Sequence, residues 1–541
     1  MKFSAPKIGA WLIVAALLAV TRLVVGAFDH PKLLLTGVGA LLLAFSRRWN
    51  PTESWPWEEP VLWRPLLACL AVLAISTIFS RDPLISIFGV YRSPFFCILT
   101  LLTAATVYVS ASMFEGDFDV ETACALVAIP VSLYAISQAL ALDPWHWELQ
   151  KGRTVATMGS PVYLGAAYAI IIPACVDLAL GKRPILGWIA LLLSSVGLAT
   201  TYSKGGMLAA AAGFAARGLL TGEIKLKRLI IPAIAFIGLG VLYLTRLPVS
   251  DLMRFELAKI SWASFKERPW LGSGPETFLL EFRRFRTDAY IAQAETTISV
   301  QASAHNDILQ ALVTTGIPGV LALAWLWFAV FKAAWDGKDA LVFSVMAALF
   351  VQAKFNPLPI PVLAVAALFA AKLPSRRLLS ETTGRVAGGG CEIIAVAGFA
   401  ICVLMGAGDR AYKTATIDQA RAAYHLHRAI SWAPWEPHYR QELVNLRFAQ
   451  AKELEPLGGR VAALLRLRLA RSAYRESVKT RRLHPADPSA HEMVANSLIL
   501  LTRHGGGNRL RAAAREMERA GELDPKLTTI IAARAALAKF Q

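Results

Sequence analysis

The chain has 541 residues, of which 55% are hydrophobic and 17% charged, and its mean hydropathy is +0.48. Soluble domains carry about 25% charged residues, so this composition excludes an ordinary soluble fold and requires lipid as the solvent for much of the surface. The net charge of +18 suggests cytoplasmic loops and anionic lipid headgroups. Nucleic acid is a poor partner, because no compact basic module with interleaved aromatic residues occurs.

The N-terminal three-quarters of the chain is a series of apolar runs. A membrane helix needs about 20 apolar residues. The first run starts near Gly9 and continues to about Ala27 without a clear cleavage signal, so we interpret it as a retained helix. Because the runs are continuously apolar, they predict helices and not barrel strands. The predicted spans are 9–28, 31–46, 61–79, 94–113, 120–142, 161–180, 185–202, 206–221, 229–246, 308–333, 340–356, 358–372 and 391–407.

The predicted fold is therefore all-α: a polytopic membrane protein of about 12–13 transmembrane helices, followed by a soluble helical domain. The spans 340–356 and 358–372 are short and split by Asn356-Pro357-Leu358-Pro359, which makes the count approximate. All six cysteines fall in apolar runs, and we interpret them as small buried hydrophobic residues. The predicted domains are residues 1–407, which include a loop at 247–307, and residues 408–541.

Lysine and arginine in short loops predict the orientation. With a cytoplasmic N-terminus, the inside loops hold Arg47-Arg48, Lys182-Arg183, Lys225 with Lys227 and Arg228, and Arg376-Arg377. The outer face then receives 80–93, 143–160, the turn 203–205, the loop 247–307 and the tail after about 407. We expect a bacterial inner (cytoplasmic) membrane protein whose loop and tail are periplasmic. An even number of spans would move the tail to the cytoplasm.

The tail has apolar residues at helical spacing and three similar segments. These segments are 420–434, 470–485 and 511–525, and each pairs small residues with a helix end and a proline. The pattern resembles the second helix of tetratricopeptide repeats, although the proline spacing departs from a 34-residue period. A generic helical bundle is the alternative. A repeat domain of this type would bind a protein partner.

His305 is the main catalytic candidate, since it lies where the polar loop 247–307 meets an apolar helix. A neutral imidazole accepts a proton from a sugar hydroxyl near neutral pH. The alternative is a histidine that only caps or packs a helix. Asn306 or Asp307 is the more natural N-cap, which leaves His305 less needed for that role.

Cations in four outer segments are candidates for binding the donor. Guanidinium groups match phosphate oxygens in bidentate fashion and do not lose their charge. Headgroup contact, a solvated helix face or snorkelling to the interface are the alternatives. The main candidates are Lys204, Arg254, Arg283, Arg284 and Arg286; secondary candidates for carrier or sugar contacts are Arg81, Arg92, Arg153, Tyr163 and Asn306.

Four segments together resemble the O-antigen ligase and polymerase family, in the order in which that family has them. Gly159–Gly165 resembles N-P-x-x-L-G with Ser160 in place of Asn, and Tyr202–Gly206 resembles the S-R-G turn with Lys204 in place of Arg. Arg268–Phe278 resembles P-L-L-G-x-G-x-x-x-F. The most specific segment is His305–Leu309 with Gly316–Gly319, which resembles H-N-x-x-L followed by G-I-x-G. The resemblance covers about residues 60–370.

The resemblance implies a GT-C-type membrane glycosyltransferase. Such a protein transfers a glycan from undecaprenyl diphosphate to an acceptor hydroxyl at the periplasmic face, with inversion and without a metal or other cofactor. By position, His305 would be the base and Lys204 would meet the diphosphate. Replacing arginine by lysine gives a point charge in place of a fork, which shifts the burden toward Arg283, Arg284 or Arg286.

Several acceptors and one other class of function stay open. Within the family, the acceptor distinguishes a ligase from an O-antigen or exopolysaccharide polymerase and from a protein O-oligosaccharyltransferase. A glycolipid, a glycan or a protein side chain would be the respective partner. A polysaccharide or lipid transporter is the alternative from another class. It is disfavoured because charge is nearly absent from the spans and concentrated in one outer loop.

Overall fold

The computed structural model describes residues 4–46, 58–91, 97–114, 118–147, 152–222, 249–294, 300–374, 377–378 and 380–537. Within these residues the fold is helical, and the all-α prediction is confirmed. The exception is a two-residue antiparallel pairing of β1 (Glu58–Glu59) with β2 (Arg377–Leu378).

The helices of the membrane part follow the apolar runs. Twelve of the thirteen predicted spans coincide with helices, and the thirteenth, 229–246, lies outside the described residues. By length and composition, four helices are suited to cross a membrane: α7, α8, α15 and α18. The helices are α1 (Ala5–Ala15) with η1 (Ala16–Leu18), α2 (His30–Ala44), α4 (Trp63–Ile78), α6 (Ile98–Ser112), α7 (Val120–Ala139), α8 (Pro161–Leu180), α9 (Pro184–Thr200), α10 (Lys204–Leu220), α15 (Asp307–Asp336), α16 (Ala340–Ala353), α17 (Ile360–Ala370) and α18 (Glu381–Ile417).

The first predicted span is too long at its C-terminal end. Helical structure stops at Leu18, and residues 19–29 form an irregular segment. Lys32 explains the break, because its buried ammonium donates hydrogen bonds to the carbonyls of Ala19 (2.6 Å) and Phe28 (2.9 Å). Because these backbone carbonyls have a hydrogen-bond partner without forming a helix, residues 19–29 can be irregular although several of them are apolar.

The outer segments predicted as loops contain helices of their own. Residues 80–93 include α5 (Pro83–Phe88), and the segment 247–307 contains α12 (Val249–Glu267), α13 (Phe278–Phe285) and α14 (Asp288–Ala294). Phe278, Phe282 and Tyr290 form a small core with Leu257 and Ile260 of α12. The polar segment thus has a hydrophobic core that holds its side chains in fixed positions.

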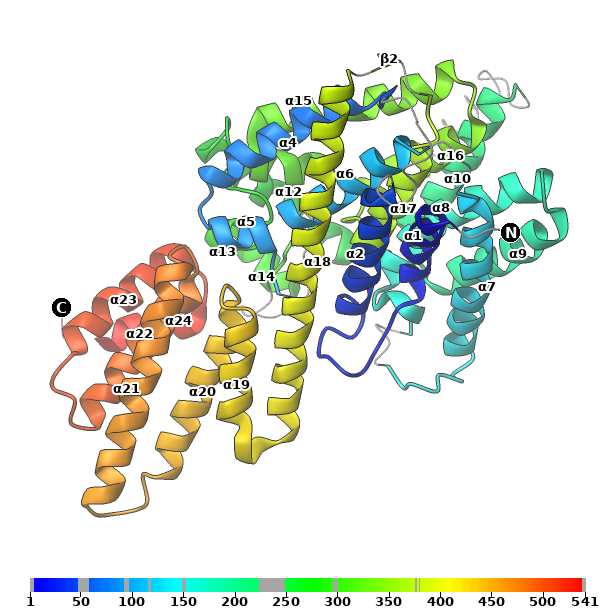
Figure 1. Cartoon of the computed structure of the whole chain (residues 1–541). Coiled ribbons are helices and arrows are strands. Elements are labelled where there is room, and N and C mark those ends of the chain that lie inside the picture. Colours follow the sequence, from blue (N-terminus) through cyan, green and yellow to red (C-terminus); the bar gives the residue numbers. More distant parts are fainter. Residues whose placement is uncertain are drawn as a thin grey trace.

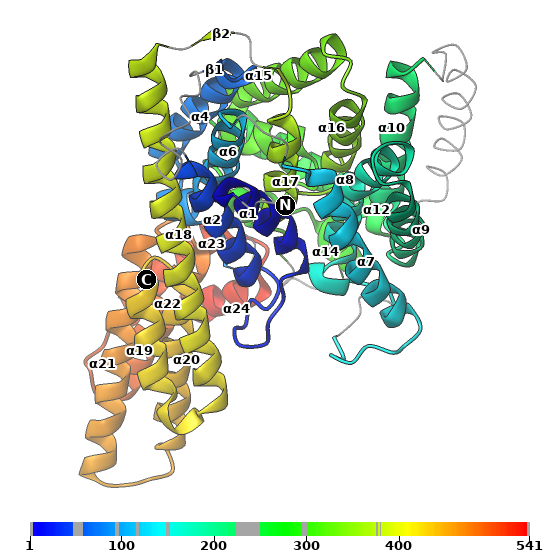
Figure 2. The same ribbon diagram turned by 45° about the vertical axis from the view of Figure 1, so that its right-hand side comes forward.

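Helix α18 joins the membrane part to the tail without interruption. Its 37 residues span about 55 Å, well beyond the roughly 30 Å hydrocarbon core of a bilayer. The predicted boundary at residue 407 falls inside this helix. Figures 1 and 2 show α18 running beside α2 and continuing into the tail, and α2 and α6 both pack against it.

The tail is a stack of antiparallel helices. It contains α19 (Ala422–Trp432, after η3 at Gln419–Arg421), α20 (Pro437–Glu453), α21 (Arg460–Leu483), α22 (Pro488–Arg503), α23 (Leu510–Leu523) and α24 (Thr528–Leu537). The three similar segments fall on α19, on the second half of α21 and on α23. Each ends at a turn before the next helix, near residues 433–437, 484–488 and 524–528.

These three turns form the edge of the tail that meets the membrane part. His484 Nδ1 lies 2.8 Å from Asp82 Oδ2, Arg286 lies 2.5 Å from Asp524, and the Trp435 ring stacks on Phe88 at 4.2 Å. The tail therefore lies on the same face as the segments 80–91 and 278–288. The structure thereby places the tail on the same side as the segment 247–307, and this holds for an even or an odd number of spans.

Candidate functional site

The first two family-like segments meet at the start of α10. A methyl group added at Gly165 would lie 2.6 Å from Ser203 Oγ, so glycine permits this approach. Ser203 caps α10 by accepting a hydrogen bond from the Gly206 amide (3.3 Å). Lys204 is consequently the first residue of the helix and is exposed.

The third and fourth segments also pack on each other. Gly316 breaks α15 with a left-handed φ of 69°, and its Cβ would lie 2.5 Å from the Pro269 carbonyl oxygen. That carbonyl accepts a hydrogen bond from the Ile317 amide (2.8 Å). Ser273 and the residue after it donate to the carbonyls of Val313 and Thr314. The third segment, Arg268–Phe278, therefore packs against the kink of α15, the helix that follows His305.

His305 is held just before α15 by two amide side chains. Asn306 is the N-cap, accepting from the amides of Ile308 (3.0 Å) and Leu309 (3.1 Å), as expected for one of the two predicted caps. His305 itself has a left-handed φ of 52° and does not cap. Its Nδ1 lies 3.1 Å from Asn356 Oδ1, and its Nε2 lies 3.3 Å from Gln301 Oε1.

The environment of His305 favours the neutral imidazole. Burial lowers the pKa of His305 below 6.5, the hydrogen bond with Asn356 opposes this, and the positive charge of Arg254 acts in the same direction as burial. A neutral ring near pH 7 has a free lone pair for one proton, as a general base requires. The left-handed backbone costs free energy, and such strain gathers at functional sites.

The guanidinium groups of Arg254 and Arg153 approach the same region from different elements. Arg254 of α12 lies over the Phe355 ring at 5.6 Å, one residue from Asn356. Burial and the charge of Arg254 both lower the pKa of Arg153, so these guanidinium groups are neighbours. Arg153 donates to the carbonyls of Thr201 (2.9 Å) and Tyr202 (3.5 Å), which directly precede the α10 cap.

Lys204 is connected to the region of Arg153 and Arg254 through the next residue, Gly205. A Cβ at Gly205 would lie 3.0 Å from the Phe355 side chain and 3.3 Å from Gln352 Oε1. Gln352 in turn donates to the carbonyl of Val162 in the first segment (3.3 Å). The turn after α16 therefore joins the cations to His305. We name Arg153, Lys204 and Arg254 the inner cations.

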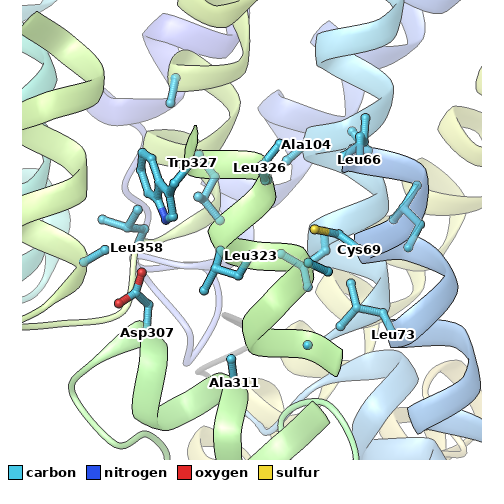
Figure 3. Close-up of a pocket in the computed structure, with 18 of the residues that line it drawn as sticks. Leu66, Cys69, Leu73, Ala104, Asp307, Ala311, Leu323, Leu326, Trp327 and Leu358 are labelled. Carbon is cyan, nitrogen blue, oxygen red and sulfur yellow. The ribbon is translucent and has the colours of Figure 1, made fainter. Parts of the chain in front are cut away.

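An apolar cavity of about 330 Å³ is lined in part by Asn356, the hydrogen-bond partner of His305. It is lined mainly by α4, α6, α15, α16 and α17, and its polar residues include Asp307, Gln310 and Asn356. Figure 3 shows side chains of α4, such as Leu66, Cys69 and Leu73, opposite Leu323, Leu326 and Trp327 of α15, with the Asp307 carboxylate at one end. Asn356 is shared, because it lines the cavity and also bonds His305.

The run Arg283, Arg284 and Arg286 has carboxylate partners, two of which come from the tail. Arg283 bonds Asp487 (2.6 Å), Arg284 bonds Glu267 (2.9 Å) and Glu281 (3.2 Å), and Arg286 bonds Asp524. Arg81 likewise bridges Glu267 (2.8 Å) and Glu281 (2.5 Å). Carboxylates therefore already meet the charge of this run, and its expected contact with a diphosphate stays a prediction.

Two other expected residues remain, Tyr163 and Arg92. Tyr163 is half-buried and packs against the main core from the first turn of α8. Arg92 lies outside the described residues. Asn356, Gln301 and Phe355 were not predicted as site residues. The available signal was the Asn356-Pro357 break between two short apolar runs, which placed a polar amide at the end of a helix.

Comparison with known families bears on the part of the chain that holds this site. A family model described as O-antigen ligase matches residues 189–324, about a quarter of the chain. No curated protein matches the chain. The matched segment includes Lys204, Arg254, His305 and the kink at Gly316. Over this segment the chain is similar to the O-antigen ligase family, which supports membrane-bound glycan transfer as its general class of activity.

Proposed function

We propose that this protein transfers a glycan from a polyprenyl-diphosphate carrier to an acceptor hydroxyl at the periplasmic face of the inner membrane. The carrier is undecaprenyl diphosphate in the family that the sequence resembles. The observation that carries the proposal is the position of Asn356. This side chain lines an apolar cavity and also forms a hydrogen bond with His305, the candidate base. It therefore connects a cavity suited to a lipid chain with the residue proposed to accept a proton.

The two parts of the donor, its isoprenoid chain and its diphosphate, need different environments. An isoprenoid chain is apolar, and a lining of leucine, alanine and one tryptophan suits it. Its diphosphate would lie at the inner cations, which Phe355 and Asn356 connect to the cavity. Fixed positive charges stabilise a diphosphate most when its charge rises as the anomeric C–O bond breaks. Arg153 and Arg254 supply planar forks, and Lys204 supplies a point charge.

His305 takes the proton of the acceptor. With Nδ1–H donated to Asn356 Oδ1, the lone pair of Nε2 is the basic site. The acceptor hydroxyl replaces Gln301 at Nε2, its oxygen attacks the anomeric carbon, and its proton passes to the imidazole. The carrier diphosphate leaves with the electron pair of the broken C–O bond. One in-line displacement inverts the anomeric centre, and no metal is required.

A complementation experiment tests this proposal and identifies the acceptor. A strain lacking the protein receives wild type or His305→Ala, and its glycolipids, exopolysaccharide and glycoproteins are separated on gels. We expect His305→Ala to lower transfer by about 10²–10⁴-fold at unchanged protein abundance. Loss of long glycolipid chains, of exopolysaccharide or of glycoprotein indicates ligase, polymerase or protein glycosylation, respectively. Near-normal product in the variant would remove His305 as the base.

Lys204 variants test the diphosphate contact in the same strain. Lys204→Ala should weaken use of the donor, and Lys204→Arg should preserve or improve it, because arginine adds a fork at the same place. Lys338, exposed in a turn between α15 and α16, is a matched lysine remote from the four family-like segments. Lys338→Ala should leave transfer unchanged. Equal activity of Lys204→Ala and wild type would exclude the contact.

A further inference from the structure

A second cavity lies between the irregular segment 19–29, the turn 143–147 and α18. Its volume is about 280 Å³. Its lining consists of two cations, one indole and small apolar side chains, and no carboxylate is among the described residues that line it: Arg22, Val24, Val25, Ala27, Trp147 and Lys413. None of these residues belongs to the proposed donor site. A cationic, aromatic lining suits a polar ligand with negative charge.

The turn that carries the indole is built around one carboxylate. Asp143 accepts four hydrogen bonds, from Tyr134 Oη (2.7 Å), Gln138 Nε2 (3.1 Å) and the backbone amides of Trp145 (2.9 Å) and Trp147 (3.2 Å). The two indole planes lie within 3° of parallel, with centroids 6.3 Å apart. Trp145 is 41% exposed. This bonding fixes two large aromatic side chains at the surface of the protein.

The cations are positioned just as specifically. Arg22 donates to the Trp145 carbonyl, and its guanidinium lies 5.0 Å from the Trp147 centroid and 5.6 Å from that of Trp145. Asp409 of α18 accepts from the Gly26 amide (2.7 Å), which ties segment 19–29 to that helix. Lys413 lies one turn beyond Asp409 and therefore faces the same segment.

We propose that this cavity binds an anionic sugar residue of the transferred glycan. Arg22 and Lys413 would bind its carboxylate or phosphate, and Trp147 would contact the pyranose ring. The C–H bonds of a pyranose face carry partial positive charge, which the negative face of an indole attracts. Guanidinium and ammonium groups supply charge-assisted hydrogen bonds to the anion.

The position of the cavity fits a subsite next to the donor. The Phe28 ring lies 4.7 Å from that of Trp147 and beside Gly159 of the first family-like segment. Arg153, an inner cation, is six residues after Trp147. A chain of six residues spans about 20 Å at most, so the two residues lie within that distance of each other. A glycan with its diphosphate at the inner cations would thus extend toward Trp147. This role rests on the proposed function, whereas binding itself can be measured without transfer.

Titration calorimetry of the full chain in lipid nanodiscs tests the inference. The probes are tetragalacturonate, its uncharged methyl ester, and a mannotetraose bearing a 6-phosphate. We expect at least one anionic probe to bind about tenfold more tightly than the ester, because each charge-assisted hydrogen bond contributes strongly. Added salt should weaken that binding. The two anionic probes distinguish carboxylate from phosphate.

Variants connect the binding to the cavity. Lys413→Gln should weaken the anionic probe about tenfold, and Trp147→Ala should weaken it about three- to tenfold. Arg410→Gln, an exposed cation on the same helix that does not line the cavity, is the matched control and should keep the wild-type affinity. His305→Ala should also bind normally, so failure of catalysis and failure of this subsite are separate results. Equal binding of charged and uncharged probes, or equal loss in Lys413→Gln and Arg410→Gln, would overturn the inference.

Discussion

Two groups of cations lie in the segments that the sequence predicts on the outer face, and their contacts differ. Among the inner cations, Arg254 lies over Phe355 in the turn that bonds His305, and Arg153 neighbours Arg254. Lys204 is connected to that turn through the close approach of Gly205 to Phe355. The run 283–286, in the same long segment as Arg254, is paired with carboxylates, two of them from the tail. Arginines about 30 positions apart in the sequence therefore lie in different surroundings. What decides the role of an arginine is the charge of its neighbours in the fold.

Replacing one member of each group gives the largest contrast. Arg254→Gln should lower transfer by about 10- to 100-fold, because a charge-assisted contact to the leaving group disappears. Arg283→Gln should keep activity within about threefold, since its half-buried ion pair with Asp487 is one of several tail contacts. Initial rates at saturating acceptor measure both. A larger loss in Arg283→Gln than in Arg254→Gln would reverse our assignment of the two groups.

Breaking the buried Arg286–Asp524 pair should release the tail. Arg286 and Asp524 are 1% and 3% exposed, so Arg286→Met leaves a buried carboxylate without its cation. Breaking such a pair costs about 3–5 kcal/mol. We expect faster proteolysis of the tail turns in Arg286→Met, read by mass spectrometry. The swap Arg286→Asp with Asp524→Arg is the control and should restore protection. Unchanged cleavage in Arg286→Met would show that the pair does not hold the tail.

The pH profile distinguishes the neighbours of His305. Its pKa is lowered, so the acid limb of kcat/KM should lie below pH 6.5. Arg254→Gln removes a lowering influence and should move that limb upward. Asn356→Leu removes a raising influence and should move it downward. A shift of a few tenths of a pH unit in the acid limb is enough to show that the two variants move it in opposite directions. Identical limbs in all three proteins would mean that another group titrates.

His484 predicts a smaller pH effect at the tail. Burial alone would lower its pKa, but the hydrogen bond and the charge of Asp82, the Trp435 carbonyl and Asp487 raise it above 6.5. A raised pKa stabilises docking below pH 6.5, and this contribution is lost as pH rises through the higher folded-state value. Burial also raises the pKa of neighbouring Glu436 to about 7, which acts in the same direction.

Hydrogen exchange of residues 484–488 between pH 6 and 9, corrected for intrinsic rates, measures this loosening. His484→Gln should reduce the pH dependence of protection, and Glu436→Gln separates the smaller second contribution. A pH dependence equal to wild type in His484→Gln would exclude the histidine as its source.

The helices of the membrane part were largely predictable from sequence. A bilayer admits few backbone structures, so each apolar run indicates a helix regardless of its neighbours. The failure at residues 19–29 has a specific cause. Lys32 and Asp409 satisfy backbone groups of that segment, and one of these partners lies hundreds of residues away. Polar contacts between distant residues override local pattern.

The site was only partly predictable. His305 could be separated from the capping role because Asn306 follows it and is the better cap. The grouping of Arg153 with Arg254 could not be predicted, since residues about a hundred positions apart meet only after the helices pack. The carboxylates that pair with Arg283 and Arg286 come from the tail. Their effect on the role of those arginines was equally invisible in the sequence.

A cryo-EM structure of the full chain in nanodiscs with undecaprenyl diphosphate tests the central claim most directly. The claim predicts the diphosphate among Arg153, Lys204 and Arg254, within reach of His305, and the lipid chain in the cavity lined by α4 and α15. A diphosphate bound at Arg283 and Arg286 with the tail displaced, or a lipid chain elsewhere with the cavity empty, would contradict it.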